Sequence, residues 1–491
     1  MEAMNKTDIV LVKPGSQKQL YGELSASNLT AIEPPLWGAL LAAYLRVKGY
    51  SVILFDAEVE NWSYLQTAER IKEAAPRLAV ITVSGTNPSA STMNMTGAGT
   101  ILKHLGEIAP GIKTALVGLH PSALPERSLN EEQADFVCQG EGFHTLPALL
   151  DALEVNSGQY DIPGLWYMRD GRVISNGRPT PWENLDELPM AAWDLLPMTK
   201  YRAHNWHCFD HINERQPYGV VYTSLGCPFK CSFCCINALF GRPGIRYRSP
   251  EFVVREVDFL VNTYGIKNIK IIDEMFALND NHVSRLCDLL IERDYGLNFW
   301  AYARVNTVNP RMLRKMKAAG INWIAYGFES GNKRVLRGVN KGYNRDNVDE
   351  IVRITYDEGL YICANYIFGL PEDDHDSMKD TLDLALRINA EWANIYSAMA
   401  YPGSRLYDQA LAEGWPLPAS WQGYSQYAYE TLPLPTKYMS GIEVLRFRDY
   451  AFNAYYQNAD YLAKIHKVFG AGTAGHVRKM TSTALPRKWC L

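Results

Sequence analysis

The chain has 491 residues, of which 47% are hydrophobic and 21% charged, with a formal net charge of -4. This length predicts two or three domains rather than one core, and the acidic balance lacks the basic surface typical of nucleic-acid binding. No basic and apolar leader opens the sequence, and the longest apolar run, residues 37–45, is far too short to cross a bilayer. We therefore expect a cytoplasmic protein with no membrane or nucleic-acid partner.

The first part of the chain, residues 1–153, alternates β-rich runs with helical stretches. Strands are expected at residues 8–15, 51–58, 77–85, 113–121 and 134–142. This alternation predicts an α/β fold with a doubly wound, Rossmann-like parallel sheet. Ligands of such sheets bind at the carboxyl ends of the strands, here near Pro14, Ser84, Gly118 and Gly140.

A second strand–helix series follows an ordered linker, residues 154–210, which is rich in Pro, Gly and Trp and has a hairpin signal at Asp170-Gly171. Within residues 211–405, strands are expected at 218–226, 268–273, 298–304, 323–330, 361–369 and 392–399. Six such units predict a partial (β/α)6 barrel with its chemistry at the carboxyl ends of the strands. Residues 406–491, rich in Tyr and Trp, predict a small helical C-terminal subdomain.

Three cysteines with the spacing Cys227-x-x-x-Cys231-x-x-Cys234 follow the first strand of this second series. Reduced thiols crowded in this way indicate metal binding or catalysis. Three thiolates can hold three irons of a [4Fe–4S] cube and leave the fourth open, whereas an electron carrier needs a fourth cysteine. A structural zinc site is the alternative, but it usually needs a second cysteine pair. Cys235 adjoins Cys234 and is expected to point elsewhere. The other cysteines are single: Cys138, Cys208, Cys287, Cys363 and Cys490.

The cysteine motif at the end of a first barrel strand resembles the signature of radical S-adenosylmethionine (SAM) enzymes. The segments "TSLGCPFKCSFC", "YRSPEFVVREVDFL", "YGFESGNKRVL" and "IFGLPEDD", and the stretch from "GLHPSALPERS" to "LLDAL", are similar to the subgroup with a cobalamin (B12)-binding domain. The resemblance implies a [4Fe–4S] cluster on Cys227, Cys231 and Cys234, SAM, cobalamin, and an electron donor such as flavodoxin or ferredoxin. In that family SAM chelates the open iron and is cleaved reductively, usually to a 5′-deoxyadenosyl radical.

The resemblance also implies roles for residues at the first three strand ends. Phe233 would lie against the adenine of SAM, and Asp273 and Glu274 stand where the family meets the methionine amino group. Arg304, at the end of the third strand, could pair with the SAM carboxylate or another anion.

The fourth and fifth strands carry further implied positions. Glu329 would accept hydrogen bonds from the ribose, with Ser330 as a second candidate. Ile367 and Gly369 belong to a segment that resembles the adenine-binding fifth strand, where Ile367 packs and Gly369 permits close approach.

The N-terminal domain departs from the cobalamin-binding pattern. The motif Asp-x-His-x-x-Gly, which supplies a lower cobalt ligand in many such domains, occurs nowhere in the chain. Ser84 to Thr86 matches the second cofactor-binding segment, whereas Gly118-Leu119 stands where a glycine pair is expected, followed by His120. Members of the radical subgroup often lack the histidine motif, so cobalamin binding remains the expectation.

The expected reaction is cobalamin-dependent methyl transfer to an unactivated centre of a small-molecule, natural-product substrate. One alternative is a cobalamin-independent reaction: transfer of the SAM aminocarboxypropyl fragment, as in arsinothricin-type transferases, epimerisation or cyclisation. Another is a cobalamin- or metal-binding sensor module. A methylthiotransferase is disfavoured because the first 150 residues contain only one cysteine, Cys138. Cys490 would matter only if an ordered tail carried its thiol into the site.

Overall fold

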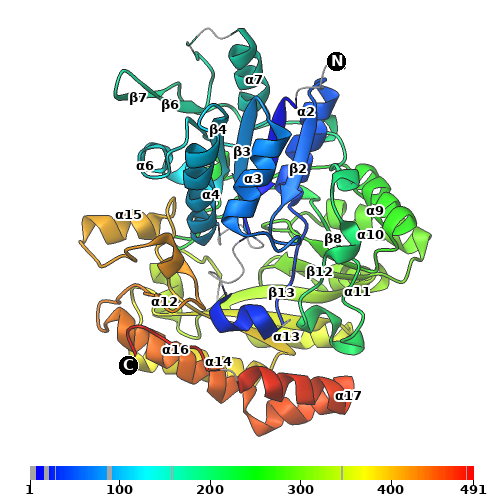
Figure 1. The fold of residues 1–491 in the computed structure, drawn as a ribbon. Helices are drawn as coiled ribbons and strands as arrows, with labels where there is room; N and C mark the ends of the chain where they lie inside the picture. Colours follow the sequence, from blue (N-terminus) through cyan, green and yellow to red (C-terminus); the bar gives the residue numbers. More distant parts are fainter. Residues whose placement is uncertain are drawn as a thin grey trace.

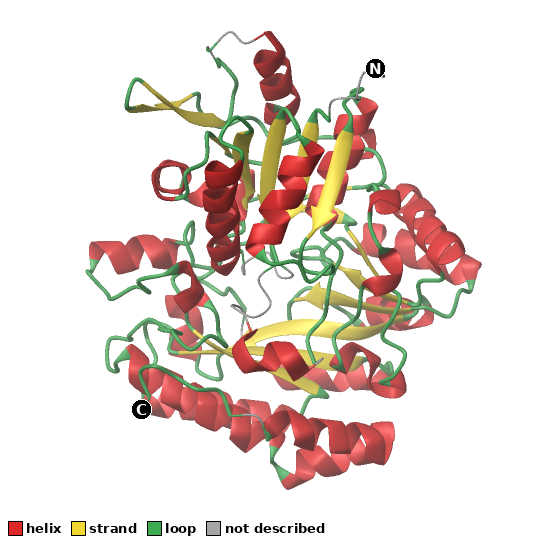
Figure 2. Cartoon of the chain, in the orientation of Figure 1, coloured by secondary structure: helices red, strands yellow, loops and turns green. Residues whose placement is uncertain are grey.

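The computed structural model describes residues 7–15, 21–27, 29–85, 91–155, 158, 160–343, 347–482 and 484–490. Its two large sheets lie one above the other, with the last two helices along the base (Figures 1 and 2). Both sheets alternate with helices along the chain, and C-terminal helices follow. The α/β class expected from the sequence is therefore confirmed.

The first sheet has the order β2-β1-β3-β4-β5-β6-β7. Its strands are β1 (Ile9–Lys13), β2 (Val52–Asp56), β3 (Leu78–Val83), β4 (Lys113–Gly118), β5 (Phe136–Cys138), β6 (Leu165–Arg169) and β7 (Arg172–Ser175). Strands β1 to β5 are parallel, and the hairpin expected at Asp170-Gly171 extends the sheet: β6 pairs antiparallel with β5, and β7 pairs antiparallel with β6. All residues of β1 and β3 are buried, as in a sheet covered on both faces.

Helices cover both faces of this sheet. They are α2 (Leu36–Val47), α3 (Tyr64–Ala74), α4 (Met95–Ile108), α5 (Leu119–Ala123), α6 (Pro125–Glu131) and α7 (Thr145–Val155). Helix α3 begins with a capping box in which the Ser63 hydroxyl accepts from Gln66 N–H. The carboxyl ends of the strands point toward the second sheet (Figure 1).

The second sheet is parallel throughout, with the order β15-β14-β13-β12-β11-β8. Its strands are β8 (Tyr218–Val221), β11 (Asn268–Ile271), β12 (Asn298–Ala303), β13 (Ile321–Glu329), β14 (Tyr361–Phe368) and β15 (Trp392–Ser397). The connecting helices are α9 (Pro250–Tyr264), α10 (Asp280–Arg293), α11 (Pro310–Ala318), α12 (Lys333–Gly338), α13 (Val348–Asp357) and α14 (His375–Ile388). Helix α9 begins at Pro250 after the Ser249 cap, and Gly265 caps its carboxyl end.

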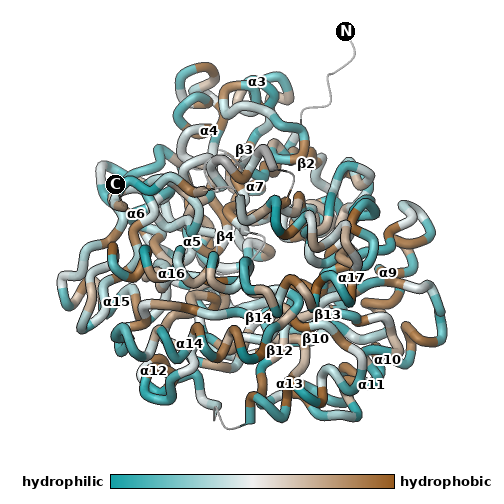
Figure 3. The backbone as a smooth tube through the Cα atoms, turned by 90° about the horizontal axis from the view of Figure 1, so that it is seen from below, coloured by the Kyte–Doolittle hydropathy of each residue, from teal (hydrophilic) through white to brown (hydrophobic). Residues whose placement is uncertain are grey.

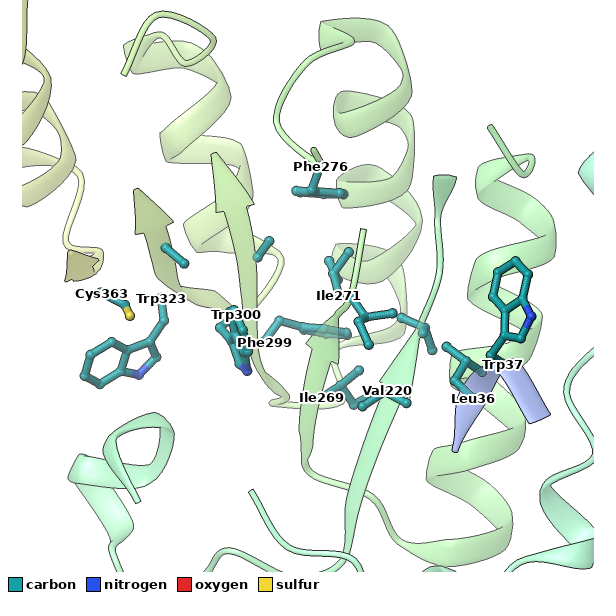
Figure 4. Close-up of a cluster of buried hydrophobic side chains, with 14 of the residues drawn as sticks. Leu36, Trp37, Val220, Ile269, Ile271, Phe276, Phe299, Trp300, Trp323 and Cys363 are labelled. Atoms are coloured by element: carbon teal, nitrogen blue, oxygen red, sulfur yellow. The ribbon is translucent and has the colours of Figure 1, made fainter. Parts of the chain in front are cut away.

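Apolar side chains fill the amino end of the barrel. Figure 4 shows Trp300 and Trp323 projecting from neighbouring strands, with Leu36 of α2 beside Val220 of β8. The Trp206 ring of η7 (Trp206–His211) lies 5.1 Å from that of Trp300 and 5.2 Å from that of Trp323. This closure leaves the carboxyl end, which faces the first domain, as the accessible end of the barrel.

The C-terminal part consists of α15 (Arg405–Ala412), η9 (Trp421–Tyr424), α16 (Gly441–Tyr456) and α17 (Ala459–Thr481). Tyr455 of α16 donates a hydrogen bond to Ala390 O, just before β15, and Tyr456 donates one to Ala393 O within β15. Hydrophilic and hydrophobic stretches alternate along outer helices such as α11 and α14 (Figure 3), which is the pattern of amphipathic helices. Among the described residues, no helix is long and apolar enough to span a membrane.

Candidate functional site

One cavity of about 890 Å³ lies where the two sheets meet. Its lining includes Lys13 and Ser84 at the strand ends of the first domain, the three clustered cysteines, and Arg448 of α16. This volume is near the upper end for small-molecule sites. The cavity is therefore large enough for more than one ligand, and each part of the chain supplies a wall.

Cys227, Cys231 and Cys234 all line this cavity and are half-buried. Burial raises the pKa of the Cys227 thiol to about 11 and that of Cys234 to about 12. Thiolates there need positive charge beside them, which a bound iron cluster would supply. Cys235 is fully buried and does not line the cavity. Three thiols facing an open cavity suit a cluster with one free iron.

The adjacent carboxyls after β11 face different surroundings. Asp273 is fully buried and accepts hydrogen bonds from Thr223 N, Thr223 Oγ1 and Ser224 Oγ at 2.5–2.7 Å. Glu274 lines the cavity and accepts one from Gly226 N at 2.9 Å. Burial raises the pKa of Asp273 to about 6 and that of Glu274 to about 8. Of the two, Glu274 has a carboxyl that a cavity ligand can reach.

Arg304 links the cysteine loop to the third strand end. Its guanidinium lies 3.9 Å from the centre of the Phe229 ring, and Nη1 donates to Cys231 Sγ at 3.4 Å. Nη2 donates to the backbone oxygen of Lys341. Arg304 lines the cavity while being only 5% exposed, so it brings a fixed positive charge beside the cysteines.

Glu329 forms a buried ion pair that the sequence did not predict. Lys341 Nζ lies 2.5 Å from Glu329 Oε1, and both side chains line the cavity at less than 10% exposure. A Cβ at Gly327 would come within 2.4 Å of Glu329 Oε1, so only glycine leaves room for the pair. A lysine in the glycine-rich stretch after α12 carries no pattern that separates it from a solvated surface residue.

The remaining positions of the barrel divide between the cavity and the core. Phe233 and Ile367 line the cavity, whereas Ser330 is fully buried and hydrogen-bonded to Thr381 Oγ1. Gly369 has a φ of 82°, and a Cβ there would lie 2.3 Å from the Val444 side chain. The close approach at Gly369 is therefore to helix α16.

In the first domain, Ser84 lines the cavity, and Thr86 lies outside the described residues. A Cβ at Gly118 would lie 2.2 Å from Val83 O, so this glycine permits β4 to approach β3. His120 packs edge-on against Trp421 and does not line the cavity. The cavity wall at Ser84 and Gly85 is formed by small residues, which suits a large planar cofactor.

The C-terminal tail is held in place, but its cysteine does not reach the cavity. Arg487 is 4% exposed and donates to Asp449 and to Gln426 O. Met480, Thr481, Ser482, Ala484 and Leu485 line the cavity. Cys490 is half-buried and outside that lining.

Comparison with known proteins agrees with this geometry. The Radical SAM superfamily matches residues 221–385, and the B12 binding domain matches residues 24–150. An uncharacterized methyltransferase of Pyrococcus horikoshii is 31% identical over 424 residues, which cover 86% of this chain and 87% of the relative. The chain belongs to the radical SAM superfamily, in the group with a B12-binding domain.

Other relatives are more distant. Cytidylyl-2-hydroxyethylphosphonate methyltransferase of Streptomyces wedmorensis is 25% identical over 434 residues, covering 77% of this chain and 78% of that enzyme. The solved radical SAM methyltransferase TsrM of Kitasatospora setae superposes with a TM-score of 0.68 at 16% identity, covering 96% of this chain and 98% of TsrM. The cobalamin-dependent radical SAM enzyme OxsB superposes with a TM-score of 0.70 at 17% identity, covering 97% of this chain and 71% of OxsB. These structures share the fold.

The two domain families identify the cofactors. A [4Fe–4S] cluster and SAM belong to the radical SAM domain, and cobalamin belongs to the B12-binding domain. The cofactors and the enzyme class expected from the sequence are thereby confirmed, and the enzyme needs a reductant. The individual residues that hold these groups remain predictions.

Proposed function

We propose that this enzyme is a cobalamin-dependent radical SAM methyltransferase that methylates an unactivated centre of a small molecule. The observation that supports it most is that one and the same cavity is lined both by Cys227, Cys231 and Cys234 and by the strand ends of the B12-binding domain. Together the bound cofactors supply a methyl group and one-electron chemistry. A substrate in this cavity is within reach of both.

The residues around the cysteines suit the zwitterionic end of SAM. Arg304 and Lys341 provide cations for its carboxylate, and Glu274 provides a carboxyl for its amino group. Glu329, held by Lys341, is available for the ribose hydroxyls. Phe233 and Ile367 offer apolar surface to the adenine. We assign the cluster to the three cysteines and the reductant to a small carrier such as flavodoxin or ferredoxin.

The test is to analyse what the enzyme makes from SAM. Protein reconstituted anaerobically with iron, sulfide and cobalamin should contain about four irons per chain and, with a reductant, yield S-adenosylhomocysteine. The matched control is the same protein prepared without cobalamin, which should form none. 5′-Deoxyadenosine without S-adenosylhomocysteine would indicate a cobalamin-independent radical reaction. Methylthioadenosine would indicate transfer of the aminocarboxypropyl fragment, and either result would overturn the proposal.

A further inference from the structure

Helix α16 places a buried arginine on a wall of the cavity formed by elements other than the cysteine loop. Arg448 is 3% exposed, and its Nε donates to Ile395 O and its Nη1 to Asp449 Oδ1, each at 2.7 Å. Nη2 has no hydrogen-bond partner within the described part of the chain. Because a guanidinium has five N–H donors, Arg448 can still donate to a ligand in the cavity.

The charges around Arg448 do not cancel. Asp449 also accepts from Arg487, through Nε at 3.1 Å and Nη2 at 3.0 Å. Burial alone would raise the pKa of Asp449, but Arg448 and Arg487 outweigh it and lower the pKa below its usual value. The carboxylate is therefore ionised and shared by two guanidiniums. Among the described residues, Asp449 is the ion-pair partner of both arginines and neither has another. Two positive charges thus share one negative charge, which leaves one surplus positive charge.

The surroundings of this charge suit the end of an organic anion. The guanidinium carbon of Arg448 lies 5.7 Å from the centre of the Tyr427 ring and 5.5 Å from that of Phe452. Asn453, further along α16, and Gln457, which caps the carboxyl end of that helix, also line the cavity. A buried guanidinium beside aromatic rings recognises planar or tetrahedral oxyanions through paired hydrogen bonds. The neighbouring rings provide surface for an apolar body.

We propose that Arg448, flanked by Tyr427 and Phe452, binds an anionic group of the substrate, either a carboxylate or a phosphoryl oxygen. This inference rests on the proposed function, because it concerns the substrate end of the same cavity. Arg304 and Lys341 stand beside the cysteines and suffice for the carboxylate of SAM. Arg448 comes from α16 instead, away from the cysteine loop, so we assign its anion to the substrate.

The experiment compares anionic probes with a neutral probe of the same size. Phenylacetate, benzylphosphonate and phenylacetamide are titrated calorimetrically into the fully reconstituted enzyme. At least one anion should bind about tenfold more tightly than the amide. Arg448→Gln should abolish that preference, and Arg448→Lys, which keeps the charge, should retain part of it. Arg446→Gln, an exposed position on the same helix, is the matched control and should leave the preference unchanged.

Equal binding of all three probes, no binding of either anion at millimolar concentration, or a preference that survives Arg448→Gln would overturn the inference. The affinity for SAM is measured in parallel. A roughly tenfold weaker affinity in Arg448→Gln alone would assign the anion to the SAM carboxylate, which also overturns it. Probe binding does not require methyl transfer. An intact preference in an enzyme that forms no S-adenosylhomocysteine would support this subsite while refuting the proposed function.

Discussion

At the residue scale, the way each buried charge is partnered decides whether a ligand can use it. Asp273 already accepts three hydrogen bonds from Thr223 and Ser224, so it acts as a structural carboxyl. Glu329 has instead a φ of 58°, a backbone conformation that costs about 1–2 kcal/mol for a residue with a Cβ. Its contact with Lys341 holds the carboxylate at the cavity wall.

Lys341 should therefore matter both for stability and for SAM. Replacing it with Met leaves Glu329 buried without its cation, and breaking such a pair costs about 3–5 kcal/mol. Lys341→Met should lower the free energy of unfolding by about 3–5 kcal/mol, measured by urea unfolding. It should also weaken the binding of SAM about tenfold, measured by equilibrium binding. Lys341→Arg is the charge-preserving control and should recover much of both. If SAM binds equally to all three proteins, Lys341 has no role in the SAM site.

His120 should make the enzyme less stable in acid. Burial, followed by the nearby Arg127, lowers the pKa of His120 to about 3. Between pH 6.5 and 3, His120 binds a proton in the unfolded chain but stays neutral in the folded protein. The free energy of unfolding therefore carries no penalty from His120 above pH 6.5, and it falls by about 1.4 kcal/mol per pH unit below that value.

The variant that tests this is His120→Phe, which keeps a ring against Trp421. Relative to the variant, the wild type should lose about 2 kcal/mol of unfolding free energy between pH 7 and pH 5. Denaturant unfolding at both pH values measures the difference. His104→Phe, on the partly exposed side of α4, is the control and should lose as much unfolding free energy between the two pH values as the wild type. An equal loss in wild type and His120→Phe would contradict the prediction.

At the element scale, local patterns determine much of the fold and little of the site. The stretch 361–369 was expected as a strand and forms β14 (Tyr361–Phe368), because an apolar run that ends at glycine is a local signal. Which of Asp273 and Glu274 faces the cavity depends instead on how the chain turns after β11 ends at Ile271, and no local pattern encodes that turn. Arg448 and Arg487 meet at Asp449 only through the packing of the C-terminal segment, which no local pattern encodes.

That packing makes a prediction for the C-terminal segment. Arg487 donates to Asp449, Gln426 O, Ala428 O and Thr431 Oγ1. Arg487→Ala removes these bonds and leaves buried acceptors unsatisfied, at about 1–3 kcal/mol for each group. The described residues from Ala484 to Cys490 should then be cut faster in limited proteolysis, monitored by mass spectrometry. Arg478→Ala, at an exposed position of α17, should be cut at the wild-type rate. Equal rates for both variants would mean that other contacts hold the segment.

At the scale of the whole molecule, the cavity exists because two sheets are held with the carboxyl ends of their strands facing each other. Buried charges contribute to that arrangement. Glu33, which precedes α2 in the first domain, pairs with Lys270 of β11 at 3.1 Å, and both side chains are 3% exposed or less. Lys13 of β1 donates to Glu33 O at 2.7 Å. The B12-binding domain is thus fixed to the interior of the barrel sheet by charge as well as by apolar packing.

A double-mutant cycle on Lys270 and Glu33 tests whether this pair joins the domains. Lys270→Met leaves Glu33 as an uncompensated buried charge and should lower the unfolding free energy by about 3–5 kcal/mol. Adding Glu33→Gln removes that charge, so the double variant should recover most of the loss. Arg285→Met breaks the exposed pair with Glu251 and, as the matched control, should cost about 1 kcal/mol or less. A double variant as unstable as Lys270→Met would show that Lys270 acts through other contacts, such as its position 4.8 Å from the centre of the Trp300 ring. Recovery would instead establish a charge-coupled joint between the cobalamin-binding and radical SAM domains.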